Sequence, residues 1–199
     1  MIERLRQKLA GYEPRKLAVS YPEAAILVPV TYSGNPEIIL TQRTTGMSTH
    51  SGQVAFPGGM REPADESLLH TALRESEEEI GLRREQVEVI SPLSQVVSLH
   101  SILVSPFAAV IPEDCTFVPQ EKELDAIFRV PVSFFLEDRR LRTDTVTIAG
   151  NKLHIPCYQW ETYQIWGLSA AVLVDFLNVA YDAGIDLSQP DPKAVAKKR

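Results

Sequence analysis

The stretch between residues 66 and 80 constrains this chain more than any other, because it has the pattern of a helix with two unlike faces. Its apolar residues recur at helical spacing: Leu69, Ala72, Leu73 and Ile80. Its acidic residues gather on the opposite face: Glu75, Glu78 and Glu79. The pattern predicts an amphipathic helix packed on a core by its apolar face, with Asp65 as N-cap and Gly81 at its end.

The acidic face is electrostatically unfavourable on its own. Carboxylates at i, i+3 and i+4 are neighbours, with Cβ atoms roughly 5–6 Å apart, so they repel one another. They also lie in the last turns, where the helix dipole disfavours negative charge. Arg74 offsets part of this through Glu78, but one arginine is too little. A solvated acidic face is one interpretation. The other is a site for a hard divalent cation, which prefers oxygen ligands.

The residues before this helix favour the cation site. A short strand at 53–56 stops at Pro57, and two glycines follow. Gly58 and Gly59 give flexible backbone whose N–H groups could hold phosphate oxygens. A tight turn without a ligand is the alternative interpretation of two adjacent glycines.

The rest of the chain alternates strand and helix patterns. Further helices are expected at 2–10, 132–136 and 167–181. Strands are expected at 24–31, 37–42, 87–97 and 105–111, with a hairpin over 145–158 that turns at Gly150 and Asn151. Strands around one helix, with another helix at the end, predict an α/β sandwich with a mixed sheet. We expect an N-terminal helical segment (1–22), a main domain (23–186) and a polar tail (187–199).

Length and charge exclude several classes of function. The 199 residues suffice for a domain with a sizeable core, and a net charge of -6 argues against a nucleic-acid partner. The apolar runs at 24–30 and 170–174 are too short to span a bilayer, so no membrane partner is expected.

Cys115 and Cys157 form no Cys-x-x-Cys pattern, which predicts reduced thiols in a cytoplasmic protein.

The segment from Gly59 to Leu82 resembles the Nudix box, a glycine and a spaced acid followed by Arg-Glu-x-x-Glu-Glu-x-Gly and an aliphatic residue. The matching positions are Arg74, Glu75, Glu78, Glu79, Gly81 and Leu82. Two positions depart from the pattern. The interval from Gly59 to Arg74 is one residue longer, so the spaced acid is Asp65 or Glu66, and counting back from Arg74 selects Glu66. Ser76 stands where an aliphatic residue is usual.

The resemblance implies a Nudix fold, a mixed β-sheet between α-helices, and hydrolysis of a nucleoside diphosphate linked to another group. It also implies Mg²⁺ or Mn²⁺ as cofactor, held by Glu75 and Glu79. Glu78 would be a third ligand, through water, or a base, and Arg74 would orient the glutamates. Nudix chains often place another glutamate after the box, and Glu121 or Glu123 would be that further ligand or general base, unless both are solvated loop residues.

Upstream and C-terminal stretches resemble the coenzyme A pyrophosphatase branch: 40–44, 52–59 and 165–171. The branch carries an arginine where Ser48 stands and usually serine or alanine where Thr44 stands. Arg43 remains a candidate contact to an anionic group of the substrate, or else a surface arginine at a strand end. The expected reaction converts coenzyme A or a derivative to 4′-phosphopantetheine and 3′,5′-ADP.

Other interpretations remain open at this point. The substrate could instead be ADP-ribose or NADH, or the chain could be a Nudix-fold sensor that binds without cutting. Such sensors usually lose a glutamate of the box, whereas this chain keeps all three. His50 and His100 could touch substrate or be surface residues. Four aromatic residues could stack on adenine, or pack in the core or a homodimer interface: Tyr158, Trp160, Tyr163 and Trp166.

Overall fold

The computed structural model describes residues 2–44, 52–148 and 151–190. The described helices are α1 (Ile2–Ala10), α2 (Leu68–Ile80), the 3-10 helix η1 (Arg84–Gln86), α3 (Val132–Leu136) and α4 (Gly167–Tyr181). The described strands are β1 (Glu23–Tyr32), β2 (Glu37–Arg43), β3 (Val54–Ala55), β4 (Gly58–Met60), β5 (Glu88–Pro92), β6 (Val96–Val97), β7 (Leu103–Pro112), β8 (Leu124–Pro131), β9 (Arg140–Ile148), β10 (Asn151–Trp160) and β11 (Tyr163–Ile165).

The larger sheet is mixed. Its strand order is β3-β2-β1-β7-β5, with β4 paired to β1, β6 to β7 and β8 to β2. β1 and β7 run parallel from Glu23 opposite Leu103 to Tyr32 opposite Pro112. The other pairs are antiparallel, such as the pairing of β2 with β8. The second sheet has three strands in the order β11-β10-β9.

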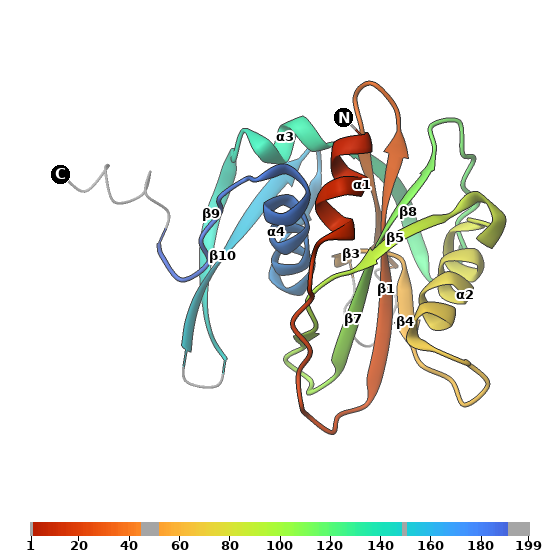
Figure 1. Cartoon of the computed structure of the whole chain (residues 1–199), viewed down its shortest axis with the longest axis horizontal. Helices are drawn as coiled ribbons and strands as arrows, with labels where there is room; N and C mark the ends of the chain where they lie inside the picture. The colour runs from red at the N-terminus through yellow and green to blue at the C-terminus, as the bar shows by residue number, and fades with distance from the viewer. Residues whose placement is uncertain (1, 45–51, 149–150, 191–199) are drawn as a thin grey trace.

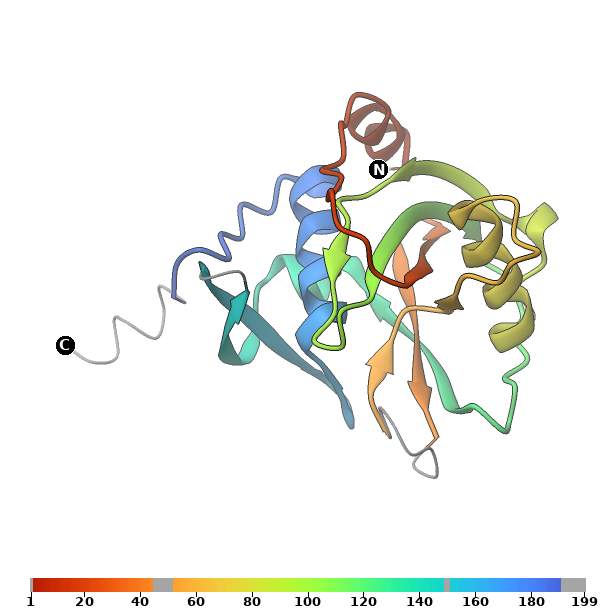
Figure 2. The same ribbon diagram turned by 90° about the horizontal axis from the view of Figure 1, so that it is seen from below.

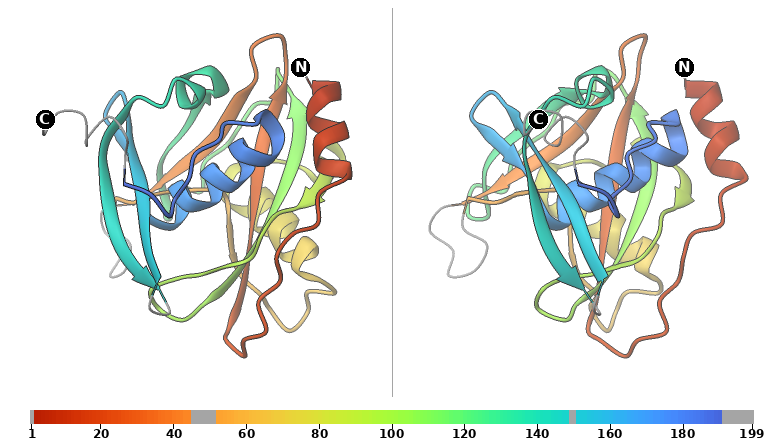
Figure 3. Two further views of the ribbon diagram at one scale, coloured as in Figure 1. Left: turned by 60° about the vertical axis from the view of Figure 1, so that its left-hand side comes forward. Right: turned by 90° about the vertical axis from the view of Figure 1, so that its left-hand side faces the viewer.

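Helices cover both faces of the larger sheet, as Figures 1 and 2 show. On β1 the side chains alternate: Leu27 belongs to the core beneath α2, and Val28 to the core shared with α1 and α4. α1 packs beside α4 through buried Leu5 and Leu9, and α4 lies between the two sheets (Figure 3). This arrangement confirms the predicted α/β class with a mixed sheet between helices.

Several predicted elements are confirmed, and others change at points of non-local pairing. α1 and α4 have the predicted bounds. The single strand expected at 87–97 is wrong, because the backbone leaves the sheet between β5 and β6. There the N–H of Ser94 donates to Asp175 of α4 at 3.1 Å, and the N–H of Gln95 donates to the carbonyl of Arg15 at 2.9 Å. The turn expected at 150 lies partly outside the described residues.

No described helix combines the length and the apolar character that crossing a bilayer requires. α4 is the longest of them, and its 15 mostly apolar residues fill the space between the sheets instead.

Candidate active site

The acidic end of α2 lies against Gly58 and Gly59 at the start of β4, which we call the glycine turn. β4 is held in the sheet by antiparallel pairing with β1, which places Gly58 opposite Ile26. From that position the backbone N–H of Gly58 donates to Oε2 of Glu79 at 3.0 Å. The expectation that this N–H holds a phosphate oxygen is therefore replaced by a different role, because it holds a carboxylate.

A side chain at either glycine would meet another group at short distance, but the group differs between the two. Gly58 has φ +149°, and a Cβ there would lie 2.3 Å from the backbone oxygen of Ala25. A Cβ on Gly59 would lie 2.4 Å from Cδ of Glu75. The room that a side chain would take at residue 59 is thus filled by the carboxylate of Glu75.

Glu79 is a buried carboxylate whose charge is only partly compensated. Its side chain is 5% exposed, and Oε1 lies 3.6 Å from Nη1 of Arg43. Burial raises the pKa of Glu79 to about 7, although the Gly58 N–H and Arg43 act in the opposite direction, and repulsion from Glu75 and Glu123 adds to the increase. Burial likewise raises the pKa of Glu75, with Arg74 opposing it. A bound cation would therefore stabilise the charged forms of Glu75 and Glu79, the two box glutamates nearest the glycine turn.

Glu123 reaches this site through a loop that closes the end of α2. The N–H of Gln120 donates to the carbonyl of Glu79 at 2.9 Å, and the N–H of Val118 donates to that of Ile80 at 3.0 Å. Glu123 is half-buried, and its negative charge raises the pKa of Glu75 and Glu79. Glu121 is exposed. Of the two glutamates that the sequence left open, Glu123 is the one beside the carboxylates.

Arg74 holds the acidic groups around it in place. Its Nε and Nη2 each donate to the carboxylate of Asp65 at 3.0 Å, forming a bidentate pair. Its Nη1 lies 3.0 Å from Glu75 and 3.1 Å from Glu78. Arg74 thus contacts two glutamates of the box, and Glu78 lies on it with a side chain 60% exposed.

The acid opposite Arg74 is Asp65, so the count that selected Glu66 is wrong. The Asp65 carboxylate is buried and also accepts from the Thr71 hydroxyl at 2.9 Å, whereas Glu66 is exposed. The Arg74 guanidinium and these hydrogen bonds hold the pKa of Asp65 well below its usual range. Asp65 is also not the N-cap of α2. That cap is Ser67, whose hydroxyl accepts from the N–H of His70.

We expect Asp65→Asn to lower kcat/KM about tenfold or more, the usual effect of removing a group that orients a ligand. Because the pKa of Asp65 is depressed in the folded protein, its stabilising effect is present above the unfolded pKa and is lost as pH falls. The variant should therefore melt below wild type at pH 7, and the difference should shrink in acid. Glu66→Gln is the matched control, and a loss confined to Glu66→Gln would reverse the assignment.

The donor set fits a hard divalent cation. Glu75 and Glu79 offer carboxylate oxygens, which Mg²⁺ and Mn²⁺ prefer. Within the described ranges, no three acidic, histidine or cysteine side chains already converge into a metal cage. Mg²⁺ usually binds one or two carboxylates together with waters and substrate phosphates. The two carboxylates of Glu75 and Glu79 agree with that coordination.

The other residues considered as substrate contacts lie outside the described residues, are exposed away from α2, or are packed against other side chains. His50 and Ser48 lie outside the described residues, and His100 is exposed in the turn before β7. Tyr158 is fully buried, so it offers no stacking surface. Trp160 packs edge-on to Phe134, and Tyr163 stacks on Phe128 at 3.9 Å. For these three aromatic residues packing is the correct interpretation, while Trp166 remains partly exposed.

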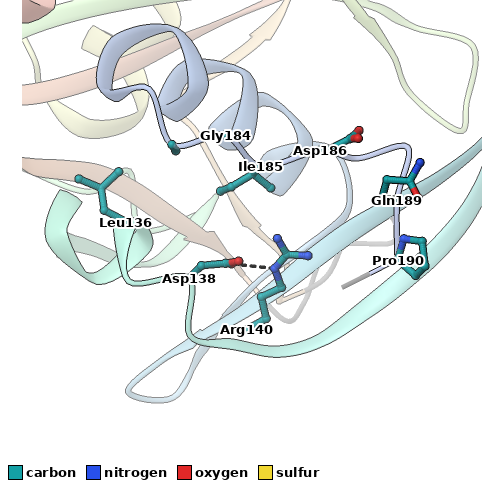
Figure 4. Close-up of a pocket in the computed structure, with 9 residues that line it drawn as sticks. Leu136, Asp138, Arg140, Gly184, Ile185, Asp186, Gln189 and Pro190 are labelled. Atoms are coloured by element: carbon teal, nitrogen blue, oxygen red, sulfur yellow. Dashed lines mark hydrogen bonds and ion pairs between the residues drawn. The ribbon is translucent and has the colours of Figure 1, made fainter. Parts of the chain in front are cut away.

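A pocket of about 540 Å³ lies apart from the carboxylate helix, between the start of β9 and the segment after α4. Figure 4 shows Arg140 and Asp138 on one side of it and Ile185 on the other. Nε of Arg140 donates to Asp138 at 2.7 Å, and the Tyr158 hydroxyl donates to the same oxygen at 3.1 Å. This pocket contains no residue of α2, and we assign it no part in the site.

Comparisons with known proteins agree on one family. A family model described as "NUDIX domain" matches residues 21–142. A Photorhabdus laumondii protein named "Uncharacterized Nudix hydrolase NudL" is 33% identical over 160 residues, which cover 80% of this chain and 86% of that protein. A Salmonella paratyphi B protein of the same name is 36% identical, over 76% of this chain and 79% of its own. The crystal structure of a MutT/nudix family protein from Enterococcus faecalis superposes with a TM-score of 0.57 at 15% identity, covering 92% of this chain and 70% of that one. That structure supports the fold.

Proposed function

The chain belongs to the Nudix hydrolase family, and from that premise we propose that it cleaves the diphosphate of coenzyme A or its derivatives. The products would be 4′-phosphopantetheine and 3′,5′-ADP. The observation that carries the hydrolytic part is a pair of carboxylates held against the glycine turn, the buried Glu79 and the half-buried Glu75. A divalent cation bound there would neutralise the diphosphate and lower the pKa of attacking water.

Each polar residue of the site has a part in this proposal. Glu75 and Glu79 bind Mg²⁺ or Mn²⁺, and Glu78 contributes through water. Arg74 keeps Glu75 and Glu78 in position from its anchor on Asp65. Glu123, whose charge acts on both ligands, accepts the proton of the attacking water. We keep Arg43 as a contact to an anionic group of the substrate.

The coenzyme A assignment is supported by three sequence stretches that lie next to one another. Residues 40–44, 52–59 and 165–171 resemble the coenzyme A branch. The N–H of Arg43 donates to the carbonyl of Gln53 at 3.0 Å, and the Ser169 hydroxyl donates to the carbonyl of Val54 at 2.9 Å. Stretches far apart in sequence thus surround the same edge of the sheet, beside the glycine turn. ADP-ribose and NADH are the alternative substrates within the family.

The proposal predicts a ranking of substrates. Coenzyme A differs from ADP-ribose by a 3′-phosphate and a pantetheine arm. A charge-assisted contact to the 3′-phosphate would contribute about 1.5–3 kcal/mol to binding. If that contact is made in the transition state, dephospho-coenzyme A should be cleaved roughly ten- to a hundredfold less efficiently. The measurement is kcat/KM for coenzyme A, dephospho-coenzyme A, ADP-ribose and NADH at one pH and one Mg²⁺ concentration.

Higher kcat/KM for ADP-ribose or NADH would reject the coenzyme A assignment and leave metal-dependent cleavage intact. Binding of all four compounds with turnover of none would instead indicate a sensor. Product masses distinguish cleavage at the diphosphate from loss of the 3′-phosphate.

A further inference from the structure

Arg43 is an ion-pair partner of the buried carboxylate of Glu79. The distance from Nη1 to Oε1, 3.6 Å, is longer than a hydrogen bond between these atoms, so the attraction is Coulombic and depends little on orientation. The other carboxylate oxygen, Oε2, is already fixed by the Gly58 N–H at 3.0 Å. The oxygen that faces Arg43 is therefore the more available one for a metal ion.

The backbone of Arg43 is fixed, while its side chain is partly exposed. The N–H of Arg43 donates to Gln53, its carbonyl accepts from the N–H of Gly52 at 3.2 Å, and the next N–H, that of Thr44, donates to the carbonyl of Glu123. The side chain is nevertheless 25% exposed, against 5% for Glu79. The guanidinium can therefore turn toward solvent when a stronger partner than Glu79 is present.

We propose that Arg43 is the resident counter-ion of Glu79, that a divalent cation displaces it, and that the displaced guanidinium then binds the substrate diphosphate. This inference rests on the metal-dependent function proposed above. A divalent cation on Glu79 would face the positive guanidinium at short range, and like charges in a poorly solvated site repel strongly. Turning toward solvent brings Arg43 to the side from which an anionic substrate arrives.

In this exchange Arg43 lowers the affinity for the metal ion and raises the affinity for the diphosphate. Without substrate it weakens metal binding by competing for Glu79, and with substrate it strengthens binding of the diphosphate. Because coupling between two ligands is reciprocal, metal and diphosphate should each favour the other through this residue. A purely structural arginine has no such sign change.

The test is calorimetric titration of Mn²⁺ into substrate-free wild type, Arg43→Gln and Arg43→Lys at pH 8. We expect Arg43→Gln to bind Mn²⁺ about fivefold tighter or more, and Arg43→Lys, which keeps the charge, to bind as wild type does. With Mn²⁺ saturating, inorganic imidodiphosphate should bind Arg43→Gln about fivefold weaker or more. Arg61→Gln is the matched control, since Arg61 pairs with Glu23 at 2.8 Å in a half-exposed ion pair.

Unchanged or weaker Mn²⁺ binding by folded Arg43→Gln would overturn the exchange, as would unchanged imidodiphosphate binding. If Glu79→Gln still loses Mn²⁺ binding in that case, the metal site stands and only the role of Arg43 fails. If wild type itself binds no Mn²⁺, the proposed function and this inference fail together. Melting curves without metal establish that each variant is folded.

Discussion

Replacing Glu79 by Gln should reduce kcat/KM for diphosphate cleavage by more than about tenfold, equivalent to a loss of about 1.4 kcal/mol or more of transition-state stabilisation. The substitution preserves shape and leaves an amide oxygen that can accept from the Gly58 N–H, as the carboxylate does at 3.0 Å. What it removes is the charge that a divalent cation needs. Steady-state kinetics with excess Mg²⁺ measures the effect.

Folding should not suffer in Glu79→Gln, because burial already disfavours the charged form of this side chain and raises its pKa to about 7. We expect a melting temperature without metal equal to or above that of wild type. Glu77→Gln is the matched control: it removes the same charge from an exposed position on α2 and should leave kcat/KM unchanged. Retention of more than about a tenth of wild-type kcat/KM by Glu79→Gln would refute the ligand role.

The two glycines before α2 should separate stability from activity. In Gly59→Ala the new Cβ would lie 2.4 Å from Cδ of Glu75, the end of a side chain that can move aside. The fold should survive, but the carboxylate would be displaced, and a shift of about 1 Å in a reacting site can lower the rate about a hundredfold. We therefore expect kcat/KM to fall by about two orders of magnitude with little change in Tm.

Gly58→Ala should behave in the opposite way. Its Cβ would meet the backbone oxygen of Ala25 at 2.3 Å, and its φ of +149° is one that residues with side chains rarely adopt. Neither strain can be relieved by a side-chain rotation, so Tm should fall clearly. Gly34→Ala, which meets nothing within 4 Å, is the control for both. Wild-type kcat/KM in Gly59→Ala would show that the position of Glu75 does not matter for catalysis.

Local patterns were sufficient to predict the carboxylate helix and its end. The alternation of apolar and acidic residues over 66–80 produced α2, and Gly81 indeed adopts φ +68° there, with its N–H bonded to the carbonyl of Glu77. Ser76, where the Nudix pattern has an aliphatic residue, is buried and satisfied, because its hydroxyl donates to the carbonyl of Ala72 at 2.7 Å. Such features depend on neighbours within one turn and can be predicted from spacing.

Features set by distant segments could not be predicted in this way. Counting along the chain favoured Glu66, but the loop before α2 turns Asp65 inward to Arg74, with the Glu62 N–H donating to the Asp65 carboxylate at 2.9 Å. The choice between Glu121 and Glu123 depended on how the 118–123 loop bonds to the last carbonyls of α2. The pairing of Gly58 with Glu79 spans 21 positions of sequence. Spacing along the chain does not encode these contacts.

The most direct test of metal binding by α2 is calorimetric titration of Mn²⁺ into wild type and Glu79→Gln, without substrate, at pH 8. Because the pKa of Glu79 is about 7, most of its carboxyl is ionised at that pH in the wild type, and protons compete little with the metal. We expect one saturable Mn²⁺ site in wild type and its loss in Glu79→Gln, in parallel with the loss of diphosphate cleavage. Mn²⁺ binding of equal affinity in the two proteins would contradict it, because the carboxylates of α2 would then not hold the metal.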